Sequence, residues 1–247
     1  MILFFTLVFG LLFGSFLNVV ISRLPLSIQG EDISINHPRR SFCPNCKHTL
    51  GAMDLIPILS FIWAKAKCRY CQKSISLRYP LVEISTALAS VLIVSQFSVG
   101  IQSGLLLLFA YMLIALFVID LERQLLPDIL TLPLLWLGLI YQMYYADLQS
   151  GVIGAIAGYL FLWSIYWLFK LIRHKEGMGY GDFKLLAVLG AWFGWQALAF
   201  IVLASSILGI IWQIISKRNK NQPFAFGPML ILAALFYVLS PQPMLLL

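Results

Sequence analysis

The stretch Leu105-Leu-Leu-Leu-Phe-Ala-Tyr-Met-Leu-Ile-Ala-Leu-Phe-Val-Ile119 is apolar throughout and runs directly into Asp120. A helix needs about 20 mostly apolar residues to cross roughly 30 Å of hydrocarbon, and this run comes close to that length. Similar runs lie on both sides of it in a chain of 247 residues, of which 61% are hydrophobic and 11% are charged. The composition, with a mean hydropathy of +0.90, predicts a membrane-embedded protein.

We predict an all-α polytopic membrane protein with about eight transmembrane helices. The predicted spans are Ile2–Ile21, Leu81–Phe97, Leu105–Ile119, Ile129–Tyr145, Val152–Phe169, Phe183–Trp195, Leu198–Ser216 and Pro228–Leu246. The first span has no basic start and no small-residue cleavage site, so we expect it to remain as a membrane helix. Three parts follow from this division: the first helix at 1–21, a cytoplasmic loop at 22–80 and a membrane-embedded core at 81–247.

The basic residues predict the orientation of these spans. All 17 Lys and Arg residues fall in four segments, namely 22–80, 120–128, 170–182 with the adjoining Lys184, and 217–227. The other connections carry a single charge, Asp147. Because cytoplasmic loops are enriched in Lys and Arg, we place the four basic segments inside and the N-terminus outside. Topology and the lipid bilayer therefore account for the net charge of +7, and no nucleic-acid partner is needed.

The predicted cytoplasmic loop holds all four cysteines, as Cys43-Pro-Asn-Cys46 and Cys68-Arg-Tyr-Cys71. Two such pairs can close a tetrahedral four-sulfur zinc site, so we predict structural zinc and a zinc-binding loop domain. Two disulfides, or thiols without a partner, are the alternatives. A reducing cytoplasm disfavours the disulfides. His48 is interpreted as a bystander, since four sulfurs already fill a tetrahedron.

The loop has few aliphatic residues with which to build a core, so a bound metal would help it to fold. Its apolar stretch Asp54–Trp63 is interrupted by Pro57 and is too short to span a membrane. We expect this stretch to lie in the membrane interface or to pack on helix ends.

Two acids stand out because a carboxylate beside or inside a membrane is costly. Asp120 follows an apolar run, where its charge meets the unfavourable end of the helix dipole, so helix capping explains it poorly. Asp182 closes Gly179-Tyr-Gly-Asp182. This is either a glycine turn with Asp182 as the cap of the next helix, or a turn whose glycines let another backbone, such as a bound peptide, approach closely. Asp128, after Pro127, suits a helix cap. Glu83, at the start of the second span, suits the positive helix end, and a functional role for it stays open.

Both conspicuous aspartates are predicted at the cytoplasmic membrane face. Two neighbouring carboxylates cannot both ionise easily and so share a proton. One can then take a proton from water while the other donates to the carbonyl oxygen of an amide. Lys184 would favour ionisation of Asp182 if its side chain turned inward. Asp120 and Asp182 are thus the candidate catalytic pair, with Gly179, Gly181, Lys184 and Asp128 as active-site support.

Several motifs together resemble the type IV prepilin peptidases, which are aspartic proteases with a Gly-x-Gly-Asp motif. The resemblance covers nearly the whole chain, in the family's order. It is carried by Gly14-Ser-Phe-Leu-Asn-Val19, the four cysteines, Arg78-Tyr-Pro-Leu-Val-Glu83, Ile119–Asp128 with Leu130-Thr-Leu-Pro133, Gly179-Tyr-Gly-Asp-Phe-Lys-Leu-Leu186 and Pro223-Phe-Ala-Phe-Gly-Pro228.

The resemblance implies an enzyme of the bacterial inner membrane that cuts the leader from type IV prepilins or type II secretion pseudopilins after a glycine. It implies Asp120 and Asp182 as the catalytic pair and the four cysteines as zinc ligands. It also implies methylation of the new N-terminus with S-adenosylmethionine as donor, for which no residues can be assigned.

The chain departs from the family pattern at two places in the loop. Ala66 stands where the family usually has a glycine, and Gly51-Ala-Met53 lacks the family's usual tryptophan. Methyl transfer is generally ascribed to this loop, so leader cleavage is the firmer expectation. Two rival hypotheses are a transporter that uses its membrane carboxylates for protons or ions, and a noncatalytic assembly scaffold.

Overall fold

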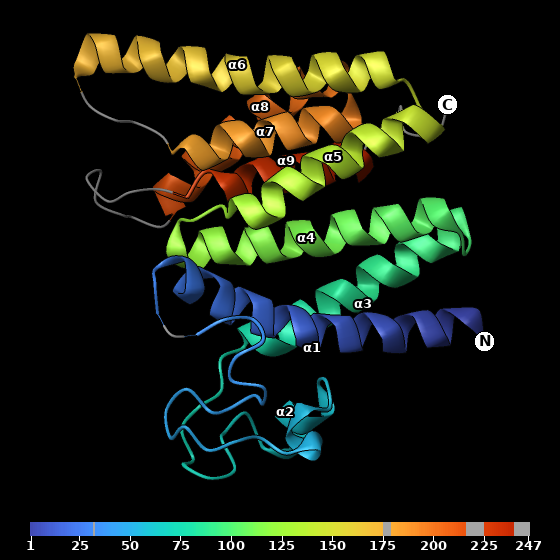
Figure 1. Cartoon of the computed structure of the whole chain (residues 1–247), viewed down its shortest axis with the longest axis vertical. Helices are drawn as coiled ribbons and strands as arrows, with labels where there is room; N and C mark the ends of the chain where they lie inside the picture. Colours follow the sequence, from blue (N-terminus) through green and yellow to red (C-terminus); the bar gives the residue numbers. More distant parts are fainter. Residues whose placement is uncertain (32, 175–178, 216–224, 240–247) are drawn as a thin grey trace. The chain divides into compact units, whose positions relative to one another are not determined.

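The computed structural model of the protein describes residues 1–31, 33–174, 179–215 and 225–239. The chain forms two compact units, Met1–Ala115 and Leu116–Leu247, which follow one another along the colour scale of Figure 1. Helix α4 (Ile101–Arg123) begins in the first unit and ends in the second. Each unit is built from helices whose apolar residues pack together, so each can be described on its own.

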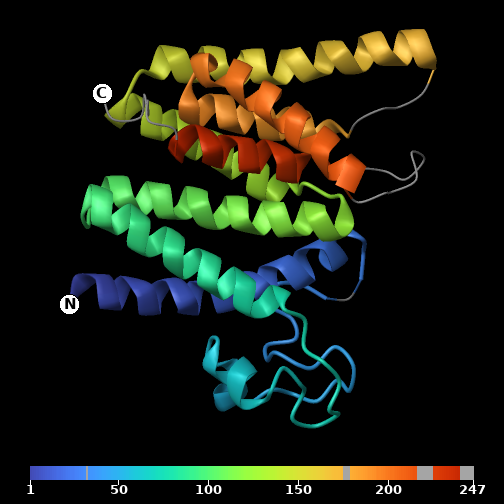
Figure 2. The ribbon, with the colours of Figure 1, turned by 180° about the vertical axis from the view of Figure 1, so that it is seen from behind.

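In the first unit, α1 (Ile2–Ile28) and α3 (Arg78–Phe97) pack along each other, as Figures 1 and 2 both show. Small residues allow this close approach. A Cβ atom added to Gly10 would lie 2.7 Å from the Cα of Ala87, and one added to Gly14 would lie 2.7 Å from the Cα of Glu83. Backbones that meet through small residues are characteristic of helix pairs in membranes.

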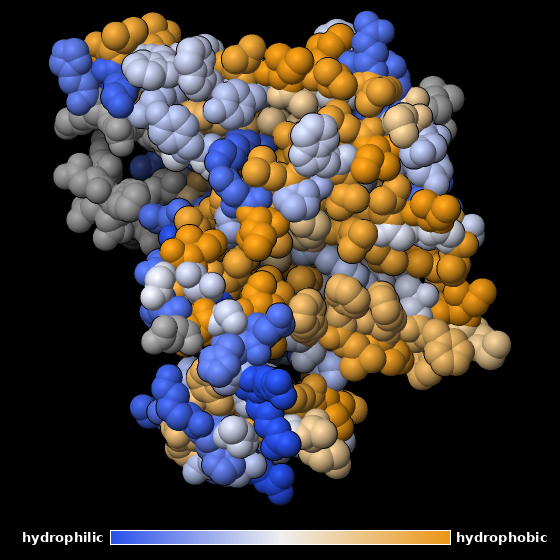
Figure 3. All heavy atoms as spheres, in the orientation of Figure 1, coloured by the Kyte–Doolittle hydropathy of each residue, from blue (hydrophilic) through white to orange (hydrophobic). Residues whose placement is uncertain are grey.

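The loop between α1 and α3 contains only short helices, η1 (Ala52–Leu55) and α2 (Leu59–Trp63). Its first part is fastened to α1 by the buried guanidinium of Arg23, which donates to the backbone carbonyls of Ile35, Pro38 and Arg40. Hydrophilic side chains gather over this loop in Figure 3, whereas hydrophobic ones dominate the visible face of the long helices.

Over its described residues, the second unit contains the end of α4 and five further helices. These are α5 (Asp128–Tyr145), α6 (Leu148–Arg173), α7 (Tyr180–Phe193), α8 (Trp195–Ile215) and α9 (Gly227–Leu239). Helix α7 is the core of the unit, because it contacts α5, α6, α8 and α9. Its residues from Leu185 to Phe193 are all buried.

Two kinds of contact hold α7 in place. Gly190 of α7 and Gly154 of α6 meet backbone to backbone, so neither position has room for a side chain. On the α5 side, the indole N–H of Trp192 donates to the carbonyl of Leu134 at 2.8 Å, and the amide of Gln142 donates to the carbonyl of Trp192 at 2.8 Å. These bonds are buried, where breaking one would leave an unpaired polar group at a cost of about 1–3 kcal/mol.

The predicted all-helical membrane architecture is confirmed. Each of the eight predicted apolar segments coincides with a helix over the residues that the structure describes. Five of these helices, α1, α3, α4, α6 and α8, are long and apolar enough to cross a membrane. Helices α7 and α9 are shorter, with 14 and 13 residues. Parts of five predicted segments lie outside the described residues, namely 32, 175–178 and 217–224 of the basic loops, 216 of the seventh span and 240–246 of the last span.

Several boundaries differ from the predicted ones. Helix α1 continues through Pro25 to Ile28, well past the predicted end at Ile21. Asp120 does not end its helix, because α4 continues to Arg123. Hydropathy marks where a helix is apolar, whereas a helix extends as far as its backbone hydrogen bonds continue, and this includes the polar residues beyond the apolar run.

Candidate active site

Asp120 lies in the last turn of α4, with 4% of its surface exposed. The backbone N–H of Gly227, at the start of α9, is directed at its carboxylate. Its Oδ2 atom is buried and has no hydrogen-bond partner among the described residues. A buried carboxylate oxygen without a partner is costly and therefore indicates a function more than a structural role.

Asp182 lies in the first turn of α7, with 8% of its surface exposed. The helix is capped by Gly179, whose backbone is extended with φ −80° and ψ 148°, so Asp182 itself is not the cap. The carboxylate of Asp182 instead reaches back to the backbone N–H of Gly179. A carboxylate in the first turn also faces the positive end of the helix dipole.

The two aspartates belong to the same unit and lie near enough for the charge of Asp120 to act on Asp182. They come from opposite ends of their helices: Asp120 from the end of α4 and Asp182 from the beginning of α7. The fold thus brings together two buried carboxylates that are far apart in the sequence. Two such groups compete for one proton.

Leu126, in the segment between α4 and α5, packs between the glycines on either side of this site. A Cβ added to Gly181 would lie 2.8 Å from the Cβ of Leu126, and a Cβ added to Gly227 would lie 3.3 Å from its Cδ1. Leu126 is 8% exposed. The buried side chain of Leu126 therefore separates the Gly179–Asp182 turn from the start of α9.

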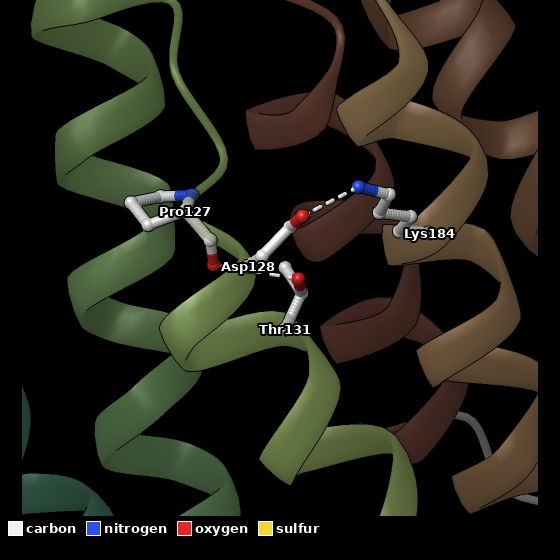
Figure 4. A network of polar contacts seen from close by, with 4 residues as sticks. All are labelled: Pro127, Asp128, Thr131 and Lys184. Atoms are coloured by element: carbon white, nitrogen blue, oxygen red, sulfur yellow. Dashed lines mark hydrogen bonds and ion pairs between the residues drawn. The ribbon is translucent and has the colours of Figure 1, made fainter. Parts of the chain in front are cut away.

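Lys184 does not pair with the catalytic candidates. Its ammonium group binds both carboxylate oxygens of Asp128, at 2.7 and 2.8 Å, and Figure 4 shows the two side chains pointing toward each other. Asp128 is the first residue of α5, and Pro127 takes the cap position that we predicted for Asp128. Thr131 donates from its hydroxyl to the carbonyl of Pro127 at 3.3 Å, which completes the turn. The ion pair joins the first residue of α5 to the second turn of α7.

The four cysteines come together in the first unit as predicted. Their sulfur atoms all lie within 4.8 Å of one another, and the sulfurs of Cys43 and Cys71 are 3.9 Å apart. In a tetrahedral zinc site with Zn–S bonds of about 2.3 Å, the sulfurs stand about 3.8 Å apart. The donor set and its spacing therefore fit a metal ion. His48 lies outside the cluster and stacks on Tyr70, with 3.7 Å between the ring centroids.

The two cysteine knuckles fold alike. In the first, the N–H of Cys43 donates to the carbonyl of His48 at 3.0 Å, and Lys47 has a left-handed backbone with φ 59°. In the second, the N–H of Cys68 donates to the carbonyl of Lys73 at 2.8 Å, and Gln72 has φ 58°. The same tight turn thus presents each pair of sulfurs.

The surroundings of the cysteine cluster shift the pKa values of two thiols in opposite directions, which favours the thiolate of Cys43 and disfavours that of Cys46. Burial acts to raise the pKa of Cys43, but backbone hydrogen bonds from Cys46 and Asn45 outweigh it and lower this pKa to about 7. A backbone hydrogen bond from His48 acts to lower the pKa of Cys46, yet desolvation and the other sulfurs raise it to about 11. A cation at the centre would relieve this repulsion.

Glu83 has a structural role in the first unit. Its side chain is 7% exposed, and Oε2 accepts a hydrogen bond of 2.8 Å from the backbone N–H of Ile58. Ile58 caps α2 with a positive φ of 61°. The carboxylate also interacts with the hydroxyl of Ser15 on α1. Glu83 therefore links the cysteine loop to both long helices of its unit.

Two family models match most of the chain. Residues 8–97 match the model of the bacterial peptidase A24 N-terminal domain, and residues 107–214 match the type IV leader peptidase family. The chain is 50% identical to a prepilin leader peptidase/N-methyltransferase of Aeromonas salmonicida over 94% of its own length and 89% of the relative. The chain belongs to the type IV leader peptidase family.

Other family members are similar over nearly the same extent. Proteins with the same name from Pseudomonas aeruginosa and Pectobacterium carotovorum are 45% and 42% identical to this chain. The alignments cover 92% and 93% of this chain and 87% and 90% of those relatives. No solved structure shows significant similarity to the chain.

Two residues of the site were missed by the sequence analysis of this family member. Leu126 was quoted only as part of a motif, and Gly227 only within Pro223–Pro228. A hydrophobic residue in a short hairpin gives no signal of its own. The Gly-Pro pair at the start of the last apolar run is a helix-start signal, since proline is favoured in the first turn. It does not reveal that the glycine will meet Asp120.

Proposed function

We propose that the protein is a membrane aspartic endopeptidase that removes the leader peptide from type IV prepilins or type II secretion pseudopilins. The observation that carries this proposal is that two buried carboxylates, Asp120 and Asp182, come from different helices of one unit and lie near enough to interact electrostatically, within the segment that matches the peptidase family. The enzyme then methylates the new N-terminus, as the names of its relatives indicate for those proteins.

The two carboxylates act as a pair in this mechanism. One accepts a proton from a water molecule, which attacks the scissile carbonyl, while the other donates a proton to the developing oxyanion. Burial of both groups keeps bulk water away and strengthens their interaction with the transition state. The unpartnered Oδ2 of Asp120 is available for this proton transfer.

Gly179 is exposed and leaves the start of the turn before Asp182 open, whereas the space beside Gly181 is filled by Leu126. A substrate in extended form can then approach the aspartates closely. The Lys184–Asp128 ion pair supports the site by joining the helix starts of α5 and α7.

We place the active site and the cysteine loop at the cytoplasmic face of the bacterial inner membrane. The support is the distribution of Lys and Arg, which concentrates in the loops on one side of the predicted spans. Zinc held by Cys43, Cys46, Cys68 and Cys71 would stabilise the loop, since a structural metal contributes its binding energy to folding. S-adenosylmethionine is the proposed methyl donor, and no residues are assigned to it.

Substitution of the aspartates tests the peptidase. Asp120→Asn and Asp182→Asn preserve size but remove the carboxylate, so each should lower the cleavage rate at least about a hundredfold. Asp147→Asn is the matched control, because Asp147 caps α6 on the surface and Asn also caps helices. Precursor and mature pilin are separated by electrophoresis at equal enzyme levels. Normal processing by either site variant would favour a scaffold or transporter and sink the proposal.

A further inference from the structure

The first turn of α9 has one backbone donor available to Asp120. The N–H groups of Met229 and Leu230 donate to the carbonyl of Phe226, at 3.0 and 3.2 Å. Pro228 has no N–H group. The N–H of Gly227 belongs to the helix-start donors that lack an acceptor within the helix. It is directed at the carboxylate of Asp120.

The contact between Gly227 and Asp120 leaves no room for a side chain. A Cβ added to Gly227 would lie 2.6 Å from Oδ2 of Asp120 and 3.3 Å from its Cγ. It would also lie 3.3 Å from the Cδ1 of Leu126, which is itself held against Gly181. A side chain at position 227 therefore cannot be accommodated by a shift of Leu126 alone, and the Asp120 carboxylate must move.

We propose that Gly227 is a positioning residue for Asp120 in leader cleavage. Its N–H orients the carboxylate, and its missing side chain leaves the buried Oδ2 in place and without a hydrogen-bond partner among the described residues for proton transfer. This inference rests on the proposed peptidase function, since it assigns Gly227 a role through Asp120. It adds α9, the last described helix, to the elements that build the site.

Gly227→Ala in the full chain tests the proposal. The purified protein in detergent is given a prepilin peptide that carries its leader and the apolar segment after the cleavage site. Because a displacement of about 1 Å can cost about a hundredfold in rate, we expect kcat to fall at least about tenfold. KM should stay within about twofold of the unsubstituted enzyme, because Gly227 is not assigned to substrate binding. Methylation of the already cleaved peptide should continue.

Gly138→Ala is the control for crowding without a carboxylate. A Cβ at Gly138 would lie 2.6 Å from Cδ1 of Trp192, and the three atoms nearest to it all belong to Trp192 and none to a catalytic candidate. This variant is expected to lose thermal stability but to keep its kcat per folded molecule. A kcat in Gly227→Ala equal to that of the unsubstituted enzyme would overturn the inference.

A stability cycle tests the same contact even if Gly227→Ala folds poorly. Asp120→Ala removes the group that a methyl at position 227 would meet. The double variant Asp120→Ala/Gly227→Ala should therefore unfold within about 2 °C of Asp120→Ala alone, while Gly227→Ala unfolds at a lower temperature than the unsubstituted protein. Equal destabilisation in both backgrounds would show that Gly227 does not act through Asp120.

The two proposals fail in distinguishable ways. If the unsubstituted enzyme does not cut the prepilin peptide, the proposed function fails and the positioning role fails with it. If the unsubstituted enzyme and Gly138→Ala both cut the peptide, and Gly227→Ala cuts it equally fast, only the role of Gly227 is wrong.

Discussion

The ammonium group of Lys184 lies 2.7 Å from Oδ1 and 2.8 Å from Oδ2 of Asp128, so an ion pair links α7 to the first residue of α5. Both side chains are partly exposed, at 31% and 55%. Exposed ion pairs contribute little to stability, typically about 0.2–1 kcal/mol. Lys184 is only two residues beyond Asp182. We therefore expect the ion pair to affect the geometry of the active site more than the stability of the protein.

Breaking this ion pair should lower activity more than stability. We expect Lys184→Met and Asp128→Asn each to lower kcat, because the start of α7 loses its link to α5, while the free energy of unfolding falls by less than about 1 kcal/mol. The double variant should be no slower than the slower single variant, since both changes remove one interaction. Cleavage kinetics and thermal unfolding of the four proteins check this. Multiplicative losses in kcat would show that the two residues act separately.

The two glycines before Asp182 should respond differently to substitution. A Cβ at Gly181 would lie 2.8 Å from the Cβ of Leu126, whereas the nearest atom to a Cβ at Gly179 is 3.9 Å away. We therefore expect Gly181→Ala to lower the cleavage rate at least about tenfold, since small displacements of catalytic groups are costly. Gly179→Ala should retain most of the activity.

Leu126 offers a second check on the same contact. Leu126→Ala makes space beside Gly181, so the double variant Gly181→Ala/Leu126→Ala should be more active than Gly181→Ala alone. Cleavage assays at equal concentrations of folded enzyme decide the outcome. Equal activity of Gly179→Ala and Gly181→Ala would contradict the explanation by crowding.

The cysteine cluster should hold one metal ion that stabilises its loop. We expect the purified protein to carry about one equivalent of zinc and Cys43→Ser or Cys68→Ser to lose it, because a tetrahedral site needs all four sulfurs. Loss of the metal should unfold the loop, so that trypsin cuts more readily after its Lys and Arg residues, several of which are already exposed in the folded loop. Asn45→Ser, within the first knuckle, is the control and should keep the metal. Elemental analysis and limited proteolysis measure both effects; full zinc retention by either cysteine variant would rule out the four-sulfur site.

Glu83 should stabilise the cysteine loop through Ile58. Glu83→Ala leaves the N–H of Ile58 without its acceptor, at a cost of about 1–3 kcal/mol if that group stays buried. Glu83→Gln keeps an acceptor oxygen and should behave almost like the unsubstituted protein. Hydrogen exchange at the amide of Ile58 reports the change directly. Glu31→Ala, at an exposed position of the same loop, is the control, and equal protection in Glu83→Ala would disprove the link.

The helices could be predicted from the sequence because a membrane helix is marked by a continuous run of apolar residues. The spacing of the cysteines likewise predicted a cluster that the fold contains. The neighbours of Asp120 and Asp182 could not be predicted in this way. Apolar runs place both acids at helix ends, but which helix ends meet depends on packing, and the Gly154–Gly190 contact has no marker in either helix alone.

Polar partners were harder to predict than polar positions. Lys184 was expected to act on Asp182, its neighbour in sequence, yet its side chain binds Asp128 on another helix. Side chains two residues apart on a helix point in different directions, so sequence proximity within α7 was misleading. Glu83 was expected at the start of its helix, yet α3 begins at Arg78 and Glu83 lies in the second turn. Its bond to Ile58 depends on how the loop folds back.

Helix α7 has 14 residues and rises about 21 Å, short of the roughly 30 Å of a bilayer core. It is enclosed by α5 and α6, which are synthesised before it, and by α8 and α9, which are synthesised after it. Helix α7, which carries Asp182, is therefore too short to insert into the membrane on its own during translation. A nascent chain that stops before α9 lacks both an enclosing helix and the neighbour of Asp120, so the proposed proteolytic activity requires that synthesis has passed α9.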